Sequence, residues 1–202
     1  YISVIRLVLA IATFSFVVYL IPGMWGAPLK ALSGYLPPME TQDFISGSYS
    51  TSVADADGPS LIVAQGLKAY DNIDDALEAG RMAGKPVFVD ISGHGCVNCR
   101  EMEARVWSDS RVRKILDEEY IIVALYTDDK TKLPENRWIT ADNGKILKDV
   151  GRVNSYIVRE RFNVNAQPNY ALLDSQTGKL LAPVRGYDLD VEKYIEFLES
   201  GL

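Results

Sequence analysis

The two cysteines are the residues of this chain with the clearest capacity for chemistry, and only Val97 and Asn98 separate them. A spacing of three positions on a helix is close to one turn, so Cys96 and Cys99 can join in a disulfide. A thiolate attacks a disulfide sulfur to form a mixed disulfide, which a second thiol then resolves. The pair is therefore predicted to exchange disulfides with other molecules.

Two structural interpretations of the cysteine pair are less favoured. A disulfide that closes so small a loop removes little chain entropy, and it would stabilise the fold only slightly. A structural zinc site usually needs four ligands, whereas the chain offers two cysteines and a single histidine. Redox exchange therefore remains the favoured chemistry.

The residues before the pair predict how it is activated. Residues 87–91 form an apolar run typical of a buried strand, and a loop with Gly93 and Gly95 separates this run from a helix that begins near Cys96. The first N–H groups of a helix lack internal partners, so they stabilise a thiolate and lower the thiol pKa. We expect Cys96 to be the exposed attacking residue and Cys99 the shielded resolving residue.

Two carboxylates accompany the cysteines. Asp90 interrupts the apolar strand six positions before Cys96, and burial there would raise its pKa. Such a group can accept the proton that Cys99 must lose and later return it; the alternative is that it only bonds a loop. Glu103 shares a helical face with Cys99 and Met102, which predicts an inward position below the pair. A solvated glutamate beside a neighbouring arginine is the open alternative.

His94 is the only histidine and lies two residues before Cys96. When protonated it would favour the thiolate. It could also join Cys96 and Cys99 as a third copper ligand, because copper favours soft thiolates. This gives an alternative function, a tethered module that binds and delivers copper, whereas the simplest interpretation is an exposed loop histidine. The favoured interpretation includes no metal site.

Pro168 precedes a predicted strand over residues 169–174. A cis Gln167–Pro168 bond that faces the cysteines would present backbone to which a partner peptide can add as a strand. Most X–Pro bonds are trans, so the sequence leaves the isomer open.

The first part of the chain differs from the rest. Residues 7–21 carry no charge, Gly or Pro, and they predict a transmembrane helix with its interfacial end over residues 1–30. A buried core helix is the alternative. Residues 31–66 contain no Lys or Arg and are predicted to be a flexible linker. Because the chain starts with Tyr1, we expect it to be part of a longer protein.

Residues 67–202 alternate between strand and helix patterns, which predicts an α/β domain with a mixed central sheet flanked by helices. The net charge of −6 argues against a nucleic-acid partner. Residues 127–150 are polar and rich in turn formers. The predicted strands cover residues 67–70, 87–91, 120–126, 169–174 and 179–184, and the predicted helices cover residues 73–83, 151–162 and 191–198, with two more beginning near 96 and 108.

The segment VFVDISGHGCVNC resembles the thioredoxin superfamily, with its strand, its Asp six residues before the first Cys and its Cys-x-x-Cys. More narrowly, CVNCREMEARVWSDSRV resembles the C-terminal domain of the DsbD family of bacterial thiol:disulfide interchange proteins. This resemblance implies a thioredoxin-like fold, with Asp90 and Glu103 tuning the thiols. It also implies a substrate-binding surface that includes Gly95, Gln167 and the cis-proline position. Gly95 departs from the tryptophan common in the superfamily.

The resemblance further implies an electron carrier with no cofactor other than its own disulfide. An upstream transmembrane electron-transfer domain would reduce the pair. The pair would then act as a protein-disulfide reductase toward extracytoplasmic thiol and disulfide proteins, such as disulfide isomerases or cytochrome c maturation factors. The expected location is the bacterial inner membrane, with the thioredoxin-like domain in the periplasm. The longer polar stretch over 127–150 is expected to shape a partner surface.

Overall fold

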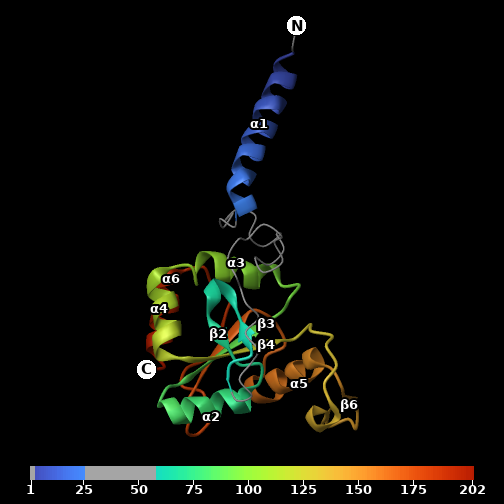
Figure 1. The fold of residues 1–202 in the computed structure, drawn as a ribbon, viewed down its shortest axis with the longest axis vertical. Helices are drawn as coiled ribbons and strands as arrows, with labels where there is room; N and C mark the ends of the chain where they lie inside the picture. Colours follow the sequence, from blue (N-terminus) through green and yellow to red (C-terminus); the bar gives the residue numbers. More distant parts are fainter. Residues whose placement is uncertain (1–2, 26–57) are drawn as a thin grey trace. The chain divides into compact units, whose positions relative to one another are not determined.

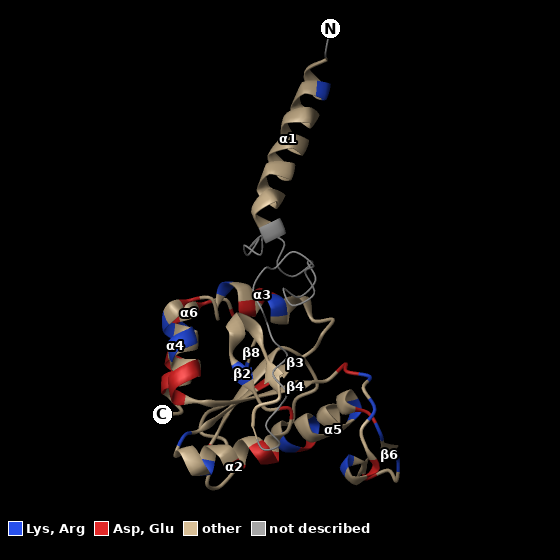
Figure 2. Cartoon of the chain, in the orientation of Figure 1, with Lys and Arg blue, Asp and Glu red and all other residues tan. Residues whose placement is uncertain are grey.

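A computed structural model describes residues 3–25 and 58–202 of the chain. Helix α1 (Val4–Leu20) begins after Ser3, whose hydroxyl accepts a hydrogen bond from the Arg6 amide, and a 3-10 turn over Ile21–Trp25 follows. None of its side chains is buried, and Arg6 is its single charged residue (Figure 2). In the described part of the chain, this is the one helix long and apolar enough to cross a membrane.

The centre of the domain described over residues 58–202 is a mixed four-stranded sheet in the order β4-β3-β7-β8 (Figure 1). Strand β3 (Val87–Ser92) pairs in parallel with β4 (Ile121–Tyr126) and antiparallel with β7 (Asn169–Leu173). All six residues of β3 are buried, as expected for an apolar strand covered on both faces. The short strand β8 (Arg185–Gly186) completes the sheet.

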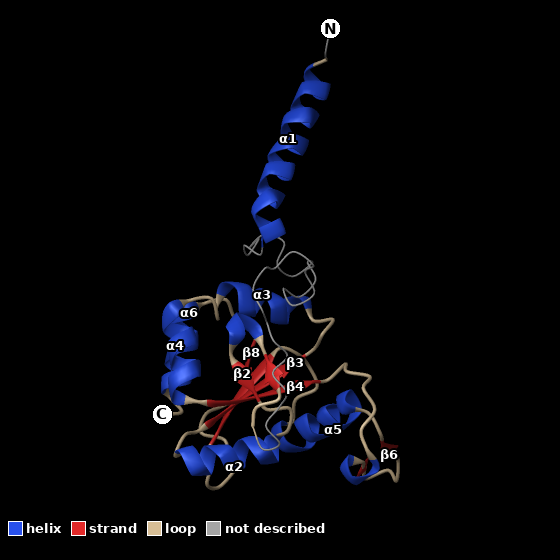
Figure 3. Ribbon diagram, in the orientation of Figure 1, coloured by secondary structure: helices blue, strands red, loops and turns tan. Residues whose placement is uncertain are grey.

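Helices cover both faces of this sheet (Figure 3). On one face a core forms between Phe88 of β3 and side chains of the third, fourth and sixth helices. On the other face Val87, Val89 and Ile91 pack against the second and fifth helices. Because strand side chains alternate, Asp90 points to the same face as Phe88. The helices are α2 (Ile73–Ala83), α3 (Val97–Arg105), α4 (Ser110–Glu119), α5 (Val150–Phe162) and α6 (Val191–Glu199).

Local sequence signals account for the ends of α2. The Asn72 side chain accepts a hydrogen bond from the Asp74 amide at 2.8 Å, which caps the first turn. Gly84 ends the helix at φ 66°, in the left-handed region that glycine enters without a steric penalty. The predicted α/β order, with a mixed sheet and flanking helices, is confirmed.

The folded domain begins earlier than residue 67. Strand β1 (Leu61–Ile62) pairs antiparallel with β2 (Lys68–Ala69), and a 3-10 turn over Ala64–Gly66 joins them. Val63 is buried in the main core. Residues 61–66 therefore correct the predicted linker boundary, because the apolar run over residues 61–63 supplies both a short strand and the buried Val63 side chain. Residues 31–57 of that linker lie outside the described residues.

The last predicted strand is also placed differently. Beyond a single bridge between Leu173 and Leu180, the pairing with β7 resumes only at Arg185. Pro183 lies between these contacts and has no N–H to donate, which explains the interruption.

Residues 127–150 form a small structured lobe. It holds a 3-10 turn (Glu135–Arg137) and a two-stranded hairpin of β5 (Ile139–Thr140) and β6 (Ile146–Leu147). Leu133 and Leu147 of the lobe pack with Val153 of the fifth helix in a small separate core.

Candidate functional site

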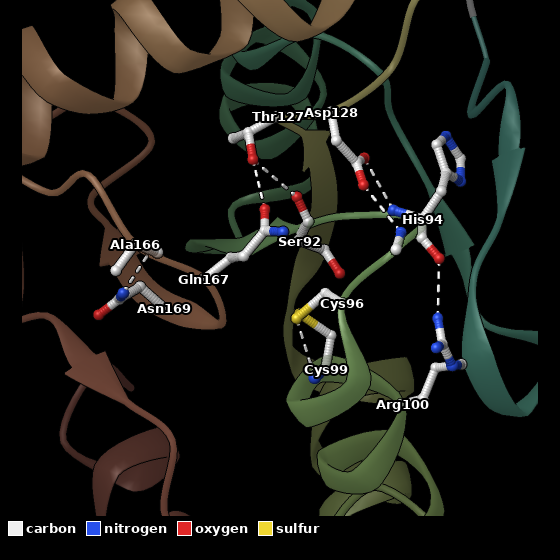
Figure 4. The surroundings of a disulfide bond; sticks show 11 residues. Ser92, His94, Cys96, Cys99, Arg100, Thr127, Asp128, Ala166, Gln167 and Asn169 are labelled. Carbon is white, nitrogen blue, oxygen red and sulfur yellow. Dashed lines mark hydrogen bonds between the residues drawn. A yellow bond between two sulfur atoms is a disulfide. The ribbon is translucent and has the colours of Figure 1, made fainter. Parts of the chain in front are cut away.

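Cys96 and Cys99 form a disulfide at the start of α3, with 5.3 Å between their Cα atoms (Figure 4). Cys96 is the N-cap residue, and its sulfur accepts a hydrogen bond from the Cys99 backbone N–H at 3.1 Å. This N–H is one of the amides that the first helical turn leaves without an intrahelical partner. In the reduced protein, the same contact would stabilise a thiolate on Cys96.

The accessibility of the two cysteines differs only slightly. Cys96 is 7% exposed and Cys99 is 2% exposed. Cys96 is thus the more accessible residue, but the expectation of an exposed attacking cysteine is corrected, because both residues are buried in the oxidised protein. Each sulfur covers part of the other in the disulfide. The Cys96 backbone N–H donates a hydrogen bond to the Gly93 carbonyl oxygen at 3.1 Å.

Asp128 holds the loop that leads into Cys96. Its two carboxylate oxygens accept hydrogen bonds from the backbone N–H groups of His94 and Gly95, each at 2.8 Å. A Cβ atom on Gly95 would lie 3.3 Å from the same carboxylate. Gly95, predicted as a substrate-binding residue, therefore also allows the close approach of Asp128. On the far side of the loop, Arg100 Nη1 donates to the His94 carbonyl oxygen at 2.7 Å.

Thr127 connects the cysteine loop to the proline loop. Its hydroxyl is hydrogen-bonded to the side-chain oxygen of Gln167 and lies 3.3 Å from the Ser92 carbonyl oxygen. A Cβ atom at Gly93 would lie 2.3 Å from the Gln167 amide, so the bare glycine makes room for Gln167. The Gln167–Pro168 bond is cis. The structure thus brings Gln167 and the cysteine loop together (Figure 4).

Sequence reasoning missed Thr127 and Asp128 as site residues. A usable signal was present: both residues directly follow β4, the parallel neighbour of β3. The carboxyl ends of adjacent parallel strands lie at one edge of a sheet, where ligands and site residues gather. Ser92 pairs with Tyr126 in register, so the residues after each strand meet.

Asp90 is 3% exposed and lies on the face of β3 that α3 covers. Burial in this apolar core raises the pKa of its carboxyl well above the usual value, and the negative charge of Glu103 raises it further. Tyr170 is paired with Asp90 on the neighbouring strand β7. Burial is also the main cause that raises the pKa of the Tyr170 hydroxyl. The predicted burial of Asp90 is therefore present, with the predicted direction of the pKa shift.

Glu103 is half-buried on α3. Its effect on the pKa of Asp90 places the two carboxyl groups within electrostatic reach of one another. The negative charge of Glu103 is therefore the second cause of the raised Asp90 pKa, after burial.

His94 is turned away from the cysteines. Its ring stacks on Tyr126, with ring centroids 4.2 Å apart and planes 4° apart, and its Nε2 lies 3.4 Å from an Asp129 carboxylate oxygen. Figure 4 shows the imidazole pointing away from the sulfur pair. Among the described residues, no group of three or more His, Cys, Asp or Glu side chains is arranged to hold a metal ion.

The sheet order, a Cys-x-x-Cys pair at the start of a helix and a cis-proline before a central strand define a thioredoxin-like protein. Residues 68–174, more than half of the chain, match the family model described as thioredoxin-like, and the chain belongs to this family. A solved DsbH oxidoreductase shares this fold, with 18% identity and a TM-score of 0.50 over 78% of this chain and 94% of that one.

Two curated proteins from bacteria are similar in sequence. The chain is 30% identical over 124 residues to the thiol:disulfide interchange protein DsbD of Ralstonia nicotianae. These matched residues make up 61% of this chain and 16% of that protein. It is 31% identical over 86 residues to the DsbD of Salmonella typhi. These matched residues make up 43% of this chain and 14% of that protein. The matched region is thus a small part of each relative's length.

Proposed function

We propose that this chain is a membrane-tethered protein-disulfide reductase. In this proposal a transmembrane electron-transfer domain upstream reduces Cys96 and Cys99, and the pair reduces disulfides of extracytoplasmic proteins. The site lies in the periplasm and α1 in the bacterial inner membrane. No cofactor other than the disulfide itself is needed. The family membership and the names of the two relatives support thiol-disulfide exchange at this site.

The hydrogen bond from the Cys99 N–H to the Cys96 sulfur is the observation that carries the proposal. A donor aimed at this sulfur stabilises negative charge on it, which is the form that attacks a disulfide. The buried Asp90 carboxyl, whose pKa burial raises above its usual value, adds a group that can take up a proton beside the pair.

The exchange proceeds in two displacements. The Cys96 thiolate attacks one sulfur of the partner disulfide, forms a mixed disulfide and releases the other partner sulfur as a thiolate. Cys99 then transfers its proton to Asp90 and attacks the Cys96 sulfur, which closes the Cys96–Cys99 disulfide and releases the second partner sulfur. Two electrons pass to the partner, and a dithiol of the upstream domain restores the reduced pair.

A reductase requires a low reduction potential, and we expect the full chain to equilibrate at about −200 mV or below, nearer to thioredoxin than to strong periplasmic oxidants. The measurement is the fraction of the oxidised pair in glutathione and dithiothreitol buffers, together with reduction of insulin disulfides. Cys96→Ser is the control without exchange. A potential near −120 mV, with oxidation of reduced protein substrates, would reverse the proposed direction of electron flow.

The proposed membrane location depends on α1. Replacing Ala12 and Phe14 together by Lys places two charges near the middle of this helix, at a cost of about 3 kcal/mol each on insertion scales. The variant is expected to move from the carbonate-washed membrane pellet to the soluble fraction, whereas the apolar control Ala12→Leu stays in the pellet. Retention of the double-Lys variant in the pellet would contradict anchoring by α1.

A further inference from the structure

We propose that Thr127 and Asp128 form a bridge that sets the position of the cysteine loop relative to the proline loop, and that this bridge controls reactivity toward folded protein disulfides. The inference rests on the proposed function and identifies two positioning residues for it. Neither side chain contacts the disulfide in Figure 4, where Asp128 and Thr127 lie above the two loops.

The bridge binds both loops through adjacent residues. Asp128 accepts from two consecutive backbone N–H groups of the cysteine loop, and the Thr127 hydroxyl bonds Gln167, which precedes the cis-proline. A hydroxyl has one proton, so the Thr127 hydroxyl shares it between Gln167 and the Ser92 carbonyl oxygen. The Thr127 backbone N–H also donates to Ser92 at 2.9 Å, independently of the side chain.

Helix α5 holds the bridge from behind. Three donors near its start bond the backbone of residues 126–129. The Asn154 side chain donates to the Tyr126 carbonyl oxygen at 3.0 Å, and the Ser155 hydroxyl donates to the Thr127 carbonyl oxygen at 3.2 Å. The Gly151 N–H donates to the Asp129 carbonyl oxygen at 2.8 Å. A Cβ atom at Gly151 would lie 2.6 Å from the Asp129 oxygen, so the helix approaches as closely as it can. The bridge is therefore a fixed support for the two loops.

This support matters most for large partners. A small disulfide needs only access to the Cys96 sulfur. A protein disulfide must also be aligned by backbone next to the cis-proline, so a displacement between the two loops slows its attack. Loss of the bridge is expected to lower reactivity with protein disulfides more than reactivity with small disulfides.

The matched variants are Thr127→Val, which removes the hydroxyl at similar volume, and Thr127→Ser, which retains it. We expect Thr127→Val in the full chain to lower the ratio of kcat/KM for insulin to the rate constant with oxidised glutathione by roughly tenfold, with most of the loss in KM. Thr127→Ser should restore the ratio. Ser200→Ala is the control, because it removes a hydroxyl that bonds a backbone carbonyl near the end of α6, outside the bridge and both loops.

A second measurement is independent of activity. In nuclear magnetic resonance spectra of the oxidised chain, Thr127→Val should shift the side-chain amide signals of Gln167, and Asp128→Ala should shift the backbone amide signals of His94 and Gly95. An unchanged ratio in Thr127→Val, or equal losses with insulin and glutathione, would overturn the bridge while leaving the exchange reaction intact. Absence of exchange in the unmodified chain would overturn the proposed function instead, and the spectra alone would then decide whether the bridge exists.

Discussion

Replacing Cys99 by Ser is expected to convert the domain into a trap that retains its partners as mixed disulfides. Cys96 still attacks, because its N-cap position and the backbone N–H of residue 99 do not depend on the second sulfur. Release then relies on external thiols, whereas the attack by Cys99 within one helical turn has a very high effective concentration. Turnover is expected to fall by about 10³-fold or more.

The measurement is non-reducing electrophoresis of the Cys99→Ser chain after exposure to oxidised periplasmic proteins, followed by identification of the bands that dithiothreitol releases. Cys96→Ser is the matched control, since it also keeps a single thiol, that of Cys99, but lacks the sulfur at the helix start. It should capture nothing. Equal capture by both variants would show that a thiol at either position suffices, which would contradict the assignment of attacking and resolving roles.

Replacing Asp90 by Asn is expected to slow resolution of the mixed disulfide by about 10²-fold at neutral pH, because a positioned base typically contributes 10²- to 10⁴-fold. Burial first and Glu103 second raise the pKa of the Asp90 carboxyl. The carboxylate is the form that accepts the Cys99 proton, so the resolution rate of the wild-type chain should rise with pH through this raised pKa. The variant should lose that rise.

Single-turnover decay of the mixed disulfide between pH 5 and 9 measures this effect. Asp117→Asn is the matched control, because Asp117 is an exposed aspartate on α4. It should follow the wild-type profile. If Asp90→Asn showed the same pH profile as the wild-type chain, Asp90 would not be the group that accepts the Cys99 proton.

The same substitution predicts a change in stability with a definite sign. A carboxyl whose pKa is raised by folding favours the folded state while it is protonated, so the wild-type chain loses stability as pH rises from about 3.9 through the raised pKa. Asp90→Asn lacks this loss. The oxidised variant should therefore be more stable than wild type at pH 8, and the difference should shrink toward pH 4. Urea unfolding measures it.

Several features of the site follow from local sequence alone. The spacing of Cys96 and Cys99, placed after an apolar strand and a glycine loop, was enough to predict a disulfide at a helix start. The apolar run on either side of Asp90 was enough to predict that this carboxyl is buried, because a strand covered on both faces buries all of its side chains. Gly84 marked the end of α2 through its conformational freedom.

Other features required the tertiary structure. Thr127 and Asp128 reach the cysteine loop only because β4 lies parallel to β3 with Tyr126 beside Ser92, a register that no local pattern encodes. The orientation of His94 toward Tyr126, away from the sulfurs, and the coverage of Cys96 likewise depend on contacts between distant segments.

The division has a physical reason. Periodicity, helix caps and turn residues act over a few positions, so the sequence determined which elements form and where the reactive sulfurs lie on them. The partners of each loop are more than 30 residues away in the chain, and packing of the whole sheet and its helices selects them. The chemistry of the cysteine pair could therefore be predicted from its own neighbourhood, whereas the alignment of the pair with the cis-proline loop was decided only by the assembled fold.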